Sequence, residues 1–261
     1  NFERDMLTFI SCAKTMTAVS KTKVPFCTTP LFQLNATEIA LQMTQYSVEE
    51  LEALLRVNGK IALENYKRYR VFHDHEETAL PAILAYTGIV FKRLNPAGFD
   101  SDDFAYAQKA LRFTSFCYGL LRPLDQIKNY RLEGDVKLPV AADHTLFSYW
   151  KDLLTDLFIE EIRQNGGTLA YLASDEMRGL FHWDKVLSAV KVITPEFHIW
   201  KGGKLSTVVV YTKMARGEMA RYIIKNRMTD PETLKAFSWE GFEYNASLSD
   251  DNKLVFTLGV G

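Results

Sequence analysis

Long hydrophobic runs and paired cysteines are missing from this 261-residue sequence. Because no stretch of about 18 apolar residues occurs, we expect no transmembrane helix. The three cysteines, Cys12, Cys27 and Cys117, are widely spaced and form no Cys-x-x-Cys pair, which argues against a disulfide framework and a zinc knuckle. The N-terminus also lacks the basic and then apolar pattern of a secretory signal. These absences predict a cytoplasmic protein without a membrane partner.

An excess of charge of either sign is missing as well. The chain has 31 Lys and Arg residues against 32 Asp and Glu residues, for a formal net charge of −1. Proteins that bind phosphate backbones usually carry a positive excess, so a nucleic-acid function requires charges that are segregated onto different faces. The loops GxxxxGK[ST], GxGxxG and GxSxG are also absent, which argues against the best-known nucleotide-binding loops and the serine-hydrolase elbow.

The composition and the order of elements predict a mixed α/β (α+β) fold with a central sheet and surrounding helices. Hydrophobic residues make up 47% of the chain, which is enough for a sizeable core. Residues 6–10 and 168–173 have the pattern of buried strands, and residues 147–164 have that of an amphipathic helix. No internal repeat or linker is present, so these elements belong to one domain.

The expected domain covers residues 6–261, with a helical insertion at residues 35–75. Residues 1–5 are unlike the start of a natural chain. We therefore expect them to be foreign to the protein, with Met6 as its initiator.

Residues 47–70 predict two helices joined by a tight turn. Ser47 and Glu50 form a capping box, which marks the start of the first helix. Asn58 and Gly59 are residue types that adopt positive φ, and the second helix follows directly. The spacing resembles the helix–hairpin–helix DNA-binding motif, in which free amides of the turn attract a phosphate. An ordinary helical hairpin with a solvated basic face is the alternative, because the turn reads Val-Asn-Gly where the motif has Gly-hydrophobic-Gly.

A second basic stretch lies at residues 201–227. This stretch contains seven basic residues and one acidic residue, Glu218, which gives a local excess of six positive charges in a nearly neutral protein. The basic residues are Lys201, Lys204, Lys213, Arg216, Arg221, Lys225 and Arg227. Such segregation suits a site for a polyanion, whereas scattered surface charge is the alternative.

Four motifs carry a resemblance to a known family. They are SCAKT at 11–15, YGLLRPLD at 118–125 followed by YRLE at 130–133, LASDE at 172–176, and ARG-x-M-x-R at 215–221. Together they resemble the YaaA peroxide-stress protein family over about residues 6–258, with Cys12 where the family has Pro. The resemblance implies a bacterial cytoplasmic protein with a helix–hairpin–helix element and a basic cleft. It also implies binding to duplex and branched DNA and a role in limiting iron-driven oxidative damage.

The leading hypothesis is a non-sequence-specific DNA-binding protein of peroxide defence that holds the phosphate backbone. Its partner is double-stranded or branched DNA, and neither a cofactor nor a protein partner is expected. The hairpin residues expected to contact DNA are Asn58, Gly59, Lys60, Lys67 and Arg68. The expected cleft residues are Lys14, Arg122, Arg131, Lys213, Arg216 and Arg221.

An enzyme that acts on a nucleotide or a phosphorylated small molecule in the same cleft is the second hypothesis. Polar side chains at expected strand ends and turns can transfer protons or hold a phosphate. The candidates for catalysis are Lys14, Asp125, Ser174, Asp175 and Glu176. A closed pocket around Asp175 or Glu176 favours catalysis, an open basic groove favours DNA, and salt-bridged scaffolding is a further alternative.

Metal and thiol chemistry are the remaining alternatives. Residues 73–77 (HDHEE) place two imidazoles and several carboxylates close together. Their spacing is not that of an established zinc or di-iron site, so we expect a solvated polar loop and no metal. Cys12 and Cys117 are expected to be buried, inert thiols rather than peroxide sensors.

Overall fold

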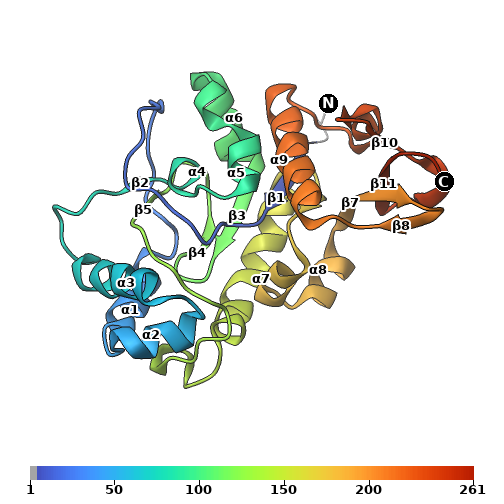
Figure 1. Cartoon of the computed structure of the whole chain (residues 1–261). Coiled ribbons are helices and arrows are strands. Elements are labelled where there is room, and N and C mark those ends of the chain that lie inside the picture. Colours follow the sequence, from blue (N-terminus) through green and yellow to red (C-terminus); the bar gives the residue numbers. More distant parts are fainter. Residues whose placement is uncertain (1–4) are drawn as a thin grey trace.

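Five parallel strands form the centre of the sheet in the computed structural model, which describes residues 5–261. In spatial order they are β3 (Leu111–Ser115), β1 (Met6–Ile10), β6 (Thr168–Leu172), β7 (Lys191–Lys201) and β11 (Lys253–Leu258). Every residue of β1 is buried, and its nearly continuous apolar run is typical of a strand covered on both faces. The expected mixed α/β fold with a central sheet is confirmed (Figure 1). Residues 1–4 lie outside the described part, so the foreign origin of residues 1–5 stays a prediction.

Antiparallel strands extend the sheet at both edges. On one side β4 (Gly119–Leu121) pairs with β3. On the other side, β11 is followed by β10 (Phe242–Tyr244) and then β9 (Ser238–Trp239). β8 (Lys204–Ser206) returns along β7, and a separate pair is formed by β2 (Leu80–Pro81) and β5 (Gln126–Ile127).

Helices cover both faces of the central strands. The C-terminal two thirds of the chain contributes α4 (Ala82–Ala85), α5 (Ile89–Leu94), α6 (Ser101–Ala110), α7 (Leu146–Gln164), α8 (Trp183–Ala189) and α9 (Val209–Lys225). Helix α9 packs against α5 and α6, whereas α7 contacts β1, β6 and α8. Figure 1 draws these two groups on opposite sides of the strands. Within residues 5–261, no helix has the length and apolar character that crossing a bilayer requires.

Three helices occupy the segment in which a helical insertion was expected. They are α1 (Gln33–Met43), α2 (Val48–Leu55) and α3 (Gly59–Val71), and they lie together at a distance from α9 (Figure 1). The capping box at the start of α2 is confirmed, because the Ser47 side chain accepts from Glu50 N–H and the Glu50 carboxylate accepts from Ser47 N–H. Helices α2 and α3 form the α2–α3 hairpin, and its Leu51, Leu55 and Ala62 are buried in the core.

The turn between α2 and α3 differs from the prediction. The left-handed residue is Arg56, with a φ of 54°, and neither Asn58 nor Gly59 has a positive φ. Asn58 is extended, and its Oδ1 accepts a hydrogen bond from the N–H of Ile61 at 2.9 Å. Because Asn58 is the N-cap of α3, its backbone must be extended, and the reversal of direction falls on the C-cap of α2. The predicted positive-φ turn at Asn58 and Gly59 is therefore wrong.

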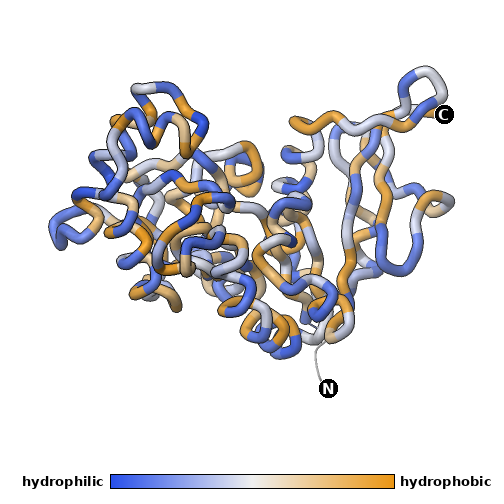
Figure 2. The backbone as a smooth tube through the Cα atoms, turned by 90° about the horizontal axis from the view of Figure 1, so that it is seen from below, coloured by the Kyte–Doolittle hydropathy of each residue, from blue (hydrophilic) through white to orange (hydrophobic). Residues whose placement is uncertain are grey.

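One face of the second half of β7 is only partly covered. Buried residues alternate there with partly exposed ones, among them Thr194, Glu196 and His198. The alternation of apolar and polar residues can be followed along the long strands near the C-terminus in Figure 2. Since side chains two residues apart point to the same face of a strand, these three line one open surface.

Helix α9 approaches α5 closely because Gly217 has no side chain. A Cβ at this position would lie 2.4 Å from the carbonyl oxygen of Val90 and 2.7 Å from the Cβ of Arg93. Both distances are far shorter than van der Waals contact. The close approach sets where the side chains of α9 lie relative to the loop after β1.

We expect Gly217→Ala to lower the free energy of unfolding by about 1–3 kcal/mol, because the new methyl group overpacks the α5–α9 contact. Alanine is otherwise the better helix former, by about 1 kcal/mol, so a loss of stability isolates the steric effect. Urea denaturation measures the change. Val209→Ala, at an exposed position of the same helix, serves as the control and should change stability by less than about 0.5 kcal/mol. Equal stability of Gly217→Ala and wild type would contradict this account.

Candidate functional site

A pocket of about 430 Å³ opens at the carboxyl ends of β1 and β6. It is surrounded by the loop after β1 (residues 11–15), the loop after β6, the first turn of α5 and one side of α9. The chain leaves β1 for β3 on one side and later reaches β6 on the other, so the pocket lies at a topological switch point of the parallel strands. Open α/β sheets generally bind their ligands at such points.

Hydroxyl groups hold the walls of the pocket. Ser11 Oγ accepts a hydrogen bond from the backbone N–H of Ser174 at 2.8 Å, which joins the loops after β1 and β6. On the opposite wall, the Tyr130 hydroxyl contacts those of Ser115 and Tyr86. Burial raises the pKa of Tyr130 well above its usual value. The walls are therefore held by the protein's own hydrogen bonds, and Tyr130 stays protonated.

A buried carboxylate, Glu133, links the pocket to the α2–α3 hairpin. Its Oε1 lies 3.0 Å from Lys14 Nζ, and its Oε2 lies 3.6 Å from a guanidinium nitrogen of Arg56. Arg56 also pairs with Asp135 at 2.8 Å. Only about 4% of the Glu133 side chain is exposed, so its charge depends on these two cations. The turn of the hairpin is in this way attached to the mouth of the pocket.

Glu176 brings a second carboxyl group to the pocket. Partial burial, followed by repulsion from Glu133, raises its pKa above the ordinary value. A carboxyl group with a raised pKa holds a proton more readily and can act as a hydrogen-bond donor or an acid. Its neighbour Asp175 points elsewhere and pairs with Arg178 at 3.1 Å.

Three cations line the pocket without an acidic partner. Among residues 5–261, Arg131, Lys213 and Arg216 have no ion pair within 4.0 Å, and Nε of Arg131 is buried without a hydrogen-bond partner. Burial lowers the pKa of Arg216, which is only partly exposed. Lys213 and Arg216 are three residues apart on α9, so they lie on the same face of the helix. The pocket therefore carries three cations that form no direct ion pair within residues 5–261, although Asp175 and Glu196 act on Arg216 from a greater distance.

Arg216 also borders a second, wider pocket of about 870 Å³. The open face of β7 lines this second pocket. On that face, His198 Nε2 lies 3.4 Å from Glu196 Oε1. The Thr212 hydroxyl is buried beside it and finds no partner among residues 5–261. Acids and bases are mixed here, so this pocket has a weaker positive bias than the first.

The candidate residues divide into three groups. The first pocket brings together Lys14, Arg131, Ser174, Glu176, Lys213 and Arg216, and Asp175 lines the second pocket. The hairpin residues Asn58, Gly59, Lys60, Lys67 and Arg68 lie on α3 and its N-cap, outside both pockets. The third group, which lines neither pocket and lies outside the α2–α3 hairpin, consists of Arg122, Asp125 and Arg221. Ser11, Tyr130 and Arg56 were missed by sequence reasoning. Ser11 and Tyr130 stand inside the family motifs, whereas nothing in the sequence marked Arg56.

Part of the predicted basic excess is engaged in packing. Arg221 donates to the backbone carbonyls of Leu94 and Asn95 at the end of α5. Lys225 and Arg227 both pair with buried Asp103, at 2.7 and 2.8 Å. These three cations hold α9 to α5 and α6, so the expected local excess of six overstates the charge that is free to meet a ligand.

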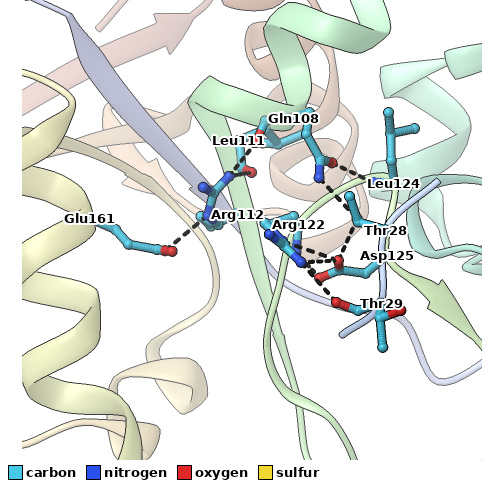
Figure 3. A network of polar contacts seen from close by, with 9 residues as sticks. All are labelled: Thr28, Thr29, Gln108, Leu111, Arg112, Arg122, Leu124, Asp125 and Glu161. Carbon is cyan, nitrogen blue, oxygen red and sulfur yellow. Dashed lines mark hydrogen bonds and ion pairs between the residues drawn. The ribbon is translucent and has the colours of Figure 1, made fainter. Parts of the chain in front are cut away.

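Arg122 belongs to an internal polar network (Figure 3). Its guanidinium donates to Asp125 Oδ1 at 2.9 Å and to the Thr29 carbonyl at 2.8 Å. Asp125 is fully buried and also accepts from Thr28 Oγ1 at 2.6 Å. Gln108 donates to the same Thr28 hydroxyl and so extends the network to α6. These contacts account for Arg122 and Asp125 without a ligand.

We expect Arg122→Ala to lower the free energy of unfolding by about 2–4 kcal/mol, because it leaves the buried carboxylate of Asp125 without its cation. Thermal and urea denaturation measure the loss. The matched control is Lys213→Ala, which removes an exposed and unpaired cation and should change stability by less than about 0.5 kcal/mol. Unchanged stability of Arg122→Ala would show that the network is dispensable and would return Arg122 to the candidate ligand contacts.

The metal alternative has no geometric support in the described residues. Within residues 5–261, no three His, Cys, Asp or Glu side chains converge on a point that could hold a metal ion. In the 73–77 loop, His73 Nε2 instead contacts the Thr37 carbonyl at 3.0 Å.

The three cysteines differ in their exposure. Cys117 is buried as expected, whereas Cys12 is only partly buried at the wall of the pocket and Cys27 is exposed. Burial, followed by repulsion from Glu176, raises the pKa of Cys12 to about 12, and burial also raises the pKa of Cys117. We therefore expect iodoacetamide near pH 7.5 to alkylate Cys27 roughly a hundredfold faster than the other two, since only the thiolate reacts. Timed labelling read by mass spectrometry tests this, with the urea-unfolded chain as the control in which all three react alike. Equal rates for Cys12 and Cys27 in the folded protein would overturn it.

The comparisons with known proteins agree on one family. The model of the family described as peroxide stress protein YaaA matches residues 6–248. A UPF0246 protein of Bacteroides thetaiotaomicron is 66% identical over 256 residues, which cover 98% of this chain and all of the relative. UPF0246 proteins of Bacteroides fragilis and Porphyromonas gingivalis are 64% and 43% identical, each over 97% of this chain and at least 99% of the relative. The chain belongs to the peroxide stress protein YaaA family.

Proposed function

We propose that this member of the peroxide stress family binds double-stranded or branched DNA through the phosphate backbone, without reading base sequence. The observation that carries the proposal is the pair Lys213 and Arg216 on one face of α9, neither of which has an acidic partner in residues 5–261. Burying part of an unpaired guanidinium costs free energy, which a phosphate contact would offset. Contacts of this kind give affinity and carry no sequence information.

The α2–α3 hairpin supplies a second set of contacts in this proposal. Lys60 and Lys67 are exposed on α3 and have no ion pair among the described residues, whereas Arg68 pairs with Glu64. The first turn of α3 has backbone N–H groups without an intrahelical partner, of which Asn58 caps one, and the Glu52 carboxylate lies beside Gly59. Arg56 links the hairpin to Glu133, and Glu133 pairs with Lys14 at the pocket mouth, so the proposal treats the two sets of contacts as parts of one binding surface.

Fluorescence anisotropy with a labelled duplex and a four-way junction, measured over a salt series, tests the proposal. We expect the logarithm of the affinity to fall linearly with the logarithm of the salt concentration, because phosphate contacts release counterions. Lys60→Glu and Arg216→Glu should each weaken binding about tenfold or more and make the salt dependence less steep by about one phosphate contact.

Lys204→Glu is the matched control, since Lys204 is exposed on the β7–β8 hairpin and lines neither pocket. It changes the net charge by the same amount and should leave the affinity within about twofold of wild type. Binding that does not depend on salt, or that falls equally in all three variants, would contradict a defined backbone site.

A further inference from the structure

We propose that the 430 Å³ pocket holds a single nucleotide unit, with its base against the aromatic wall and its phosphate at Arg216 and Lys213. The nucleotide would arrive either free in solution or as an unpaired nucleotide of bound DNA. This inference deepens the proposed function of the same site, since it names what enters the pocket beside the phosphate-binding surface.

The volume of the pocket is that of a small-molecule site and is too small for a DNA duplex. Pockets that bind small molecules measure about 300–1,000 Å³, and this one lies in the lower part of that range. It is far too small for a duplex, whose phosphates can reach only its rim. Contacts to a DNA backbone therefore leave the interior unexplained, although it sits at the switch point of the sheet.

The interior is suited to a planar aromatic group. Phe91, Phe116, Tyr130 and Met177 contribute to its lining. Aromatic walls accept any base, because every base presents a π face. Ser11 and Glu176 add a hydroxyl and a carboxyl group that can form hydrogen bonds with the polar edge of a base.

The charge of the pocket is suited to a phosphate. Lys14 forms an ion pair with Glu133 and contributes no net charge. The remaining cations are Arg131, Lys213 and Arg216, and they face one acid, Glu176. Among residues 5–261, these three cations have no acidic partner, so the pocket carries an excess of two positive charges for a phosphate monoester to neutralise.

Two binding measurements on the full chain separate the two sources of the nucleotide. Isothermal titration calorimetry with nucleoside 5′-monophosphates, the matching nucleosides and inorganic phosphate measures binding of the free ligand. Anisotropy measures binding of a duplex, of a duplex with a one-nucleotide bulge, and of the same duplex with an abasic residue at the bulge.

For a free nucleotide we expect saturable binding of the monophosphates that is at least about tenfold tighter than that of nucleosides or phosphate. For an unpaired nucleotide of DNA we expect the bulge to bind about tenfold tighter than its abasic counterpart.

Three variants assign either result to the pocket. Arg216→Ala should weaken monophosphate binding about tenfold or more and also weaken duplex binding. Glu176→Gln, which keeps the shape of the side chain, should alter the preference among bases or for the bulge over its abasic counterpart. Lys60→Glu should weaken duplex binding and leave monophosphate binding unchanged, because Lys60 lies outside the pocket.

The outcomes distinguish this inference from the proposed function. Duplex binding that persists with no monophosphate binding and no preference for the bulge over the abasic bulge overturns the nucleotide pocket and leaves DNA binding intact. Monophosphate binding that Arg216→Ala abolishes, without measurable binding of any DNA, supports the pocket and rejects the DNA proposal. Absence of binding to every one of these ligands overturns both.

Discussion

The charge of one buried carboxylate organises the surroundings of the pocket. Glu133 is almost completely buried, and an ionised group in that position is tolerated only when it is paired. Its partners come from two distant segments, Lys14 in the loop after β1 and Arg56 in the turn of the α2–α3 hairpin. Arg56 has the left-handed backbone that non-glycine residues adopt at a cost, and its two ion pairs offset that strain. The hairpin, which packs on the core through Leu51, Leu55 and Ala62, is in this way also linked to the buried carboxylate at the pocket.

Although the net charge is close to zero, the basic residues fall into two groups, those that form ion pairs within the fold and those around the pocket that do not. One group is structural, as Arg122 is with Asp125, and as Lys225 and Arg227 are with Asp103. Burial by itself would raise the pKa of Asp103, but hydrogen bonds from Lys225, the Asp100 amide and Arg227 lower it to about 2. The Asp103 carboxylate therefore stabilises the fold above its unfolded pKa of about 3.9, and this contribution is lost as the pH falls from about 4 towards 2. The other group has no ion pair within residues 5–261 and lies around the pocket, so the local excess describes this surface better than the net charge does.

The sequence predicted the fold class and most elements because these depend on local signals. The buried run at 6–10 and the Ser47 and Glu50 capping box each have one strong local cause, and each appears as expected. The turn after α2 was predicted wrongly because Asn58 suits two roles. It can adopt a positive φ in a tight turn, as Gly59 can, and it can also serve as an extended N-cap, which is the role it has in the structure. The left-handed backbone falls on Arg56 instead, at the C-cap of α2, and the partner of its side chain, Glu133, lies 77 positions later in the chain.

The same limit applies to the candidate site. Arg122 and Arg216 both stand in family motifs, yet Arg122 pairs with Asp125 and Arg216 has no ion pair among residues 5–261. Only the three-dimensional arrangement separates them, because the partners of Arg122 include the distant Thr29 carbonyl.

Arg216 is the residue for which the folded chain alone gives no sufficient reason. Its guanidinium is partly buried, and burial lowers its pKa while Tyr171 and Asp175 oppose the shift. Nearby Arg178 adds repulsion, although it is held by Asp175 and lies over the ring of Tyr171. An arginine whose only function was to pack would lose less free energy as an apolar residue of the same length. A cation kept in this setting, at the switch point of the sheet and beside a pocket with an aromatic wall, is consistent with selection for an anion that is absent from the chain itself.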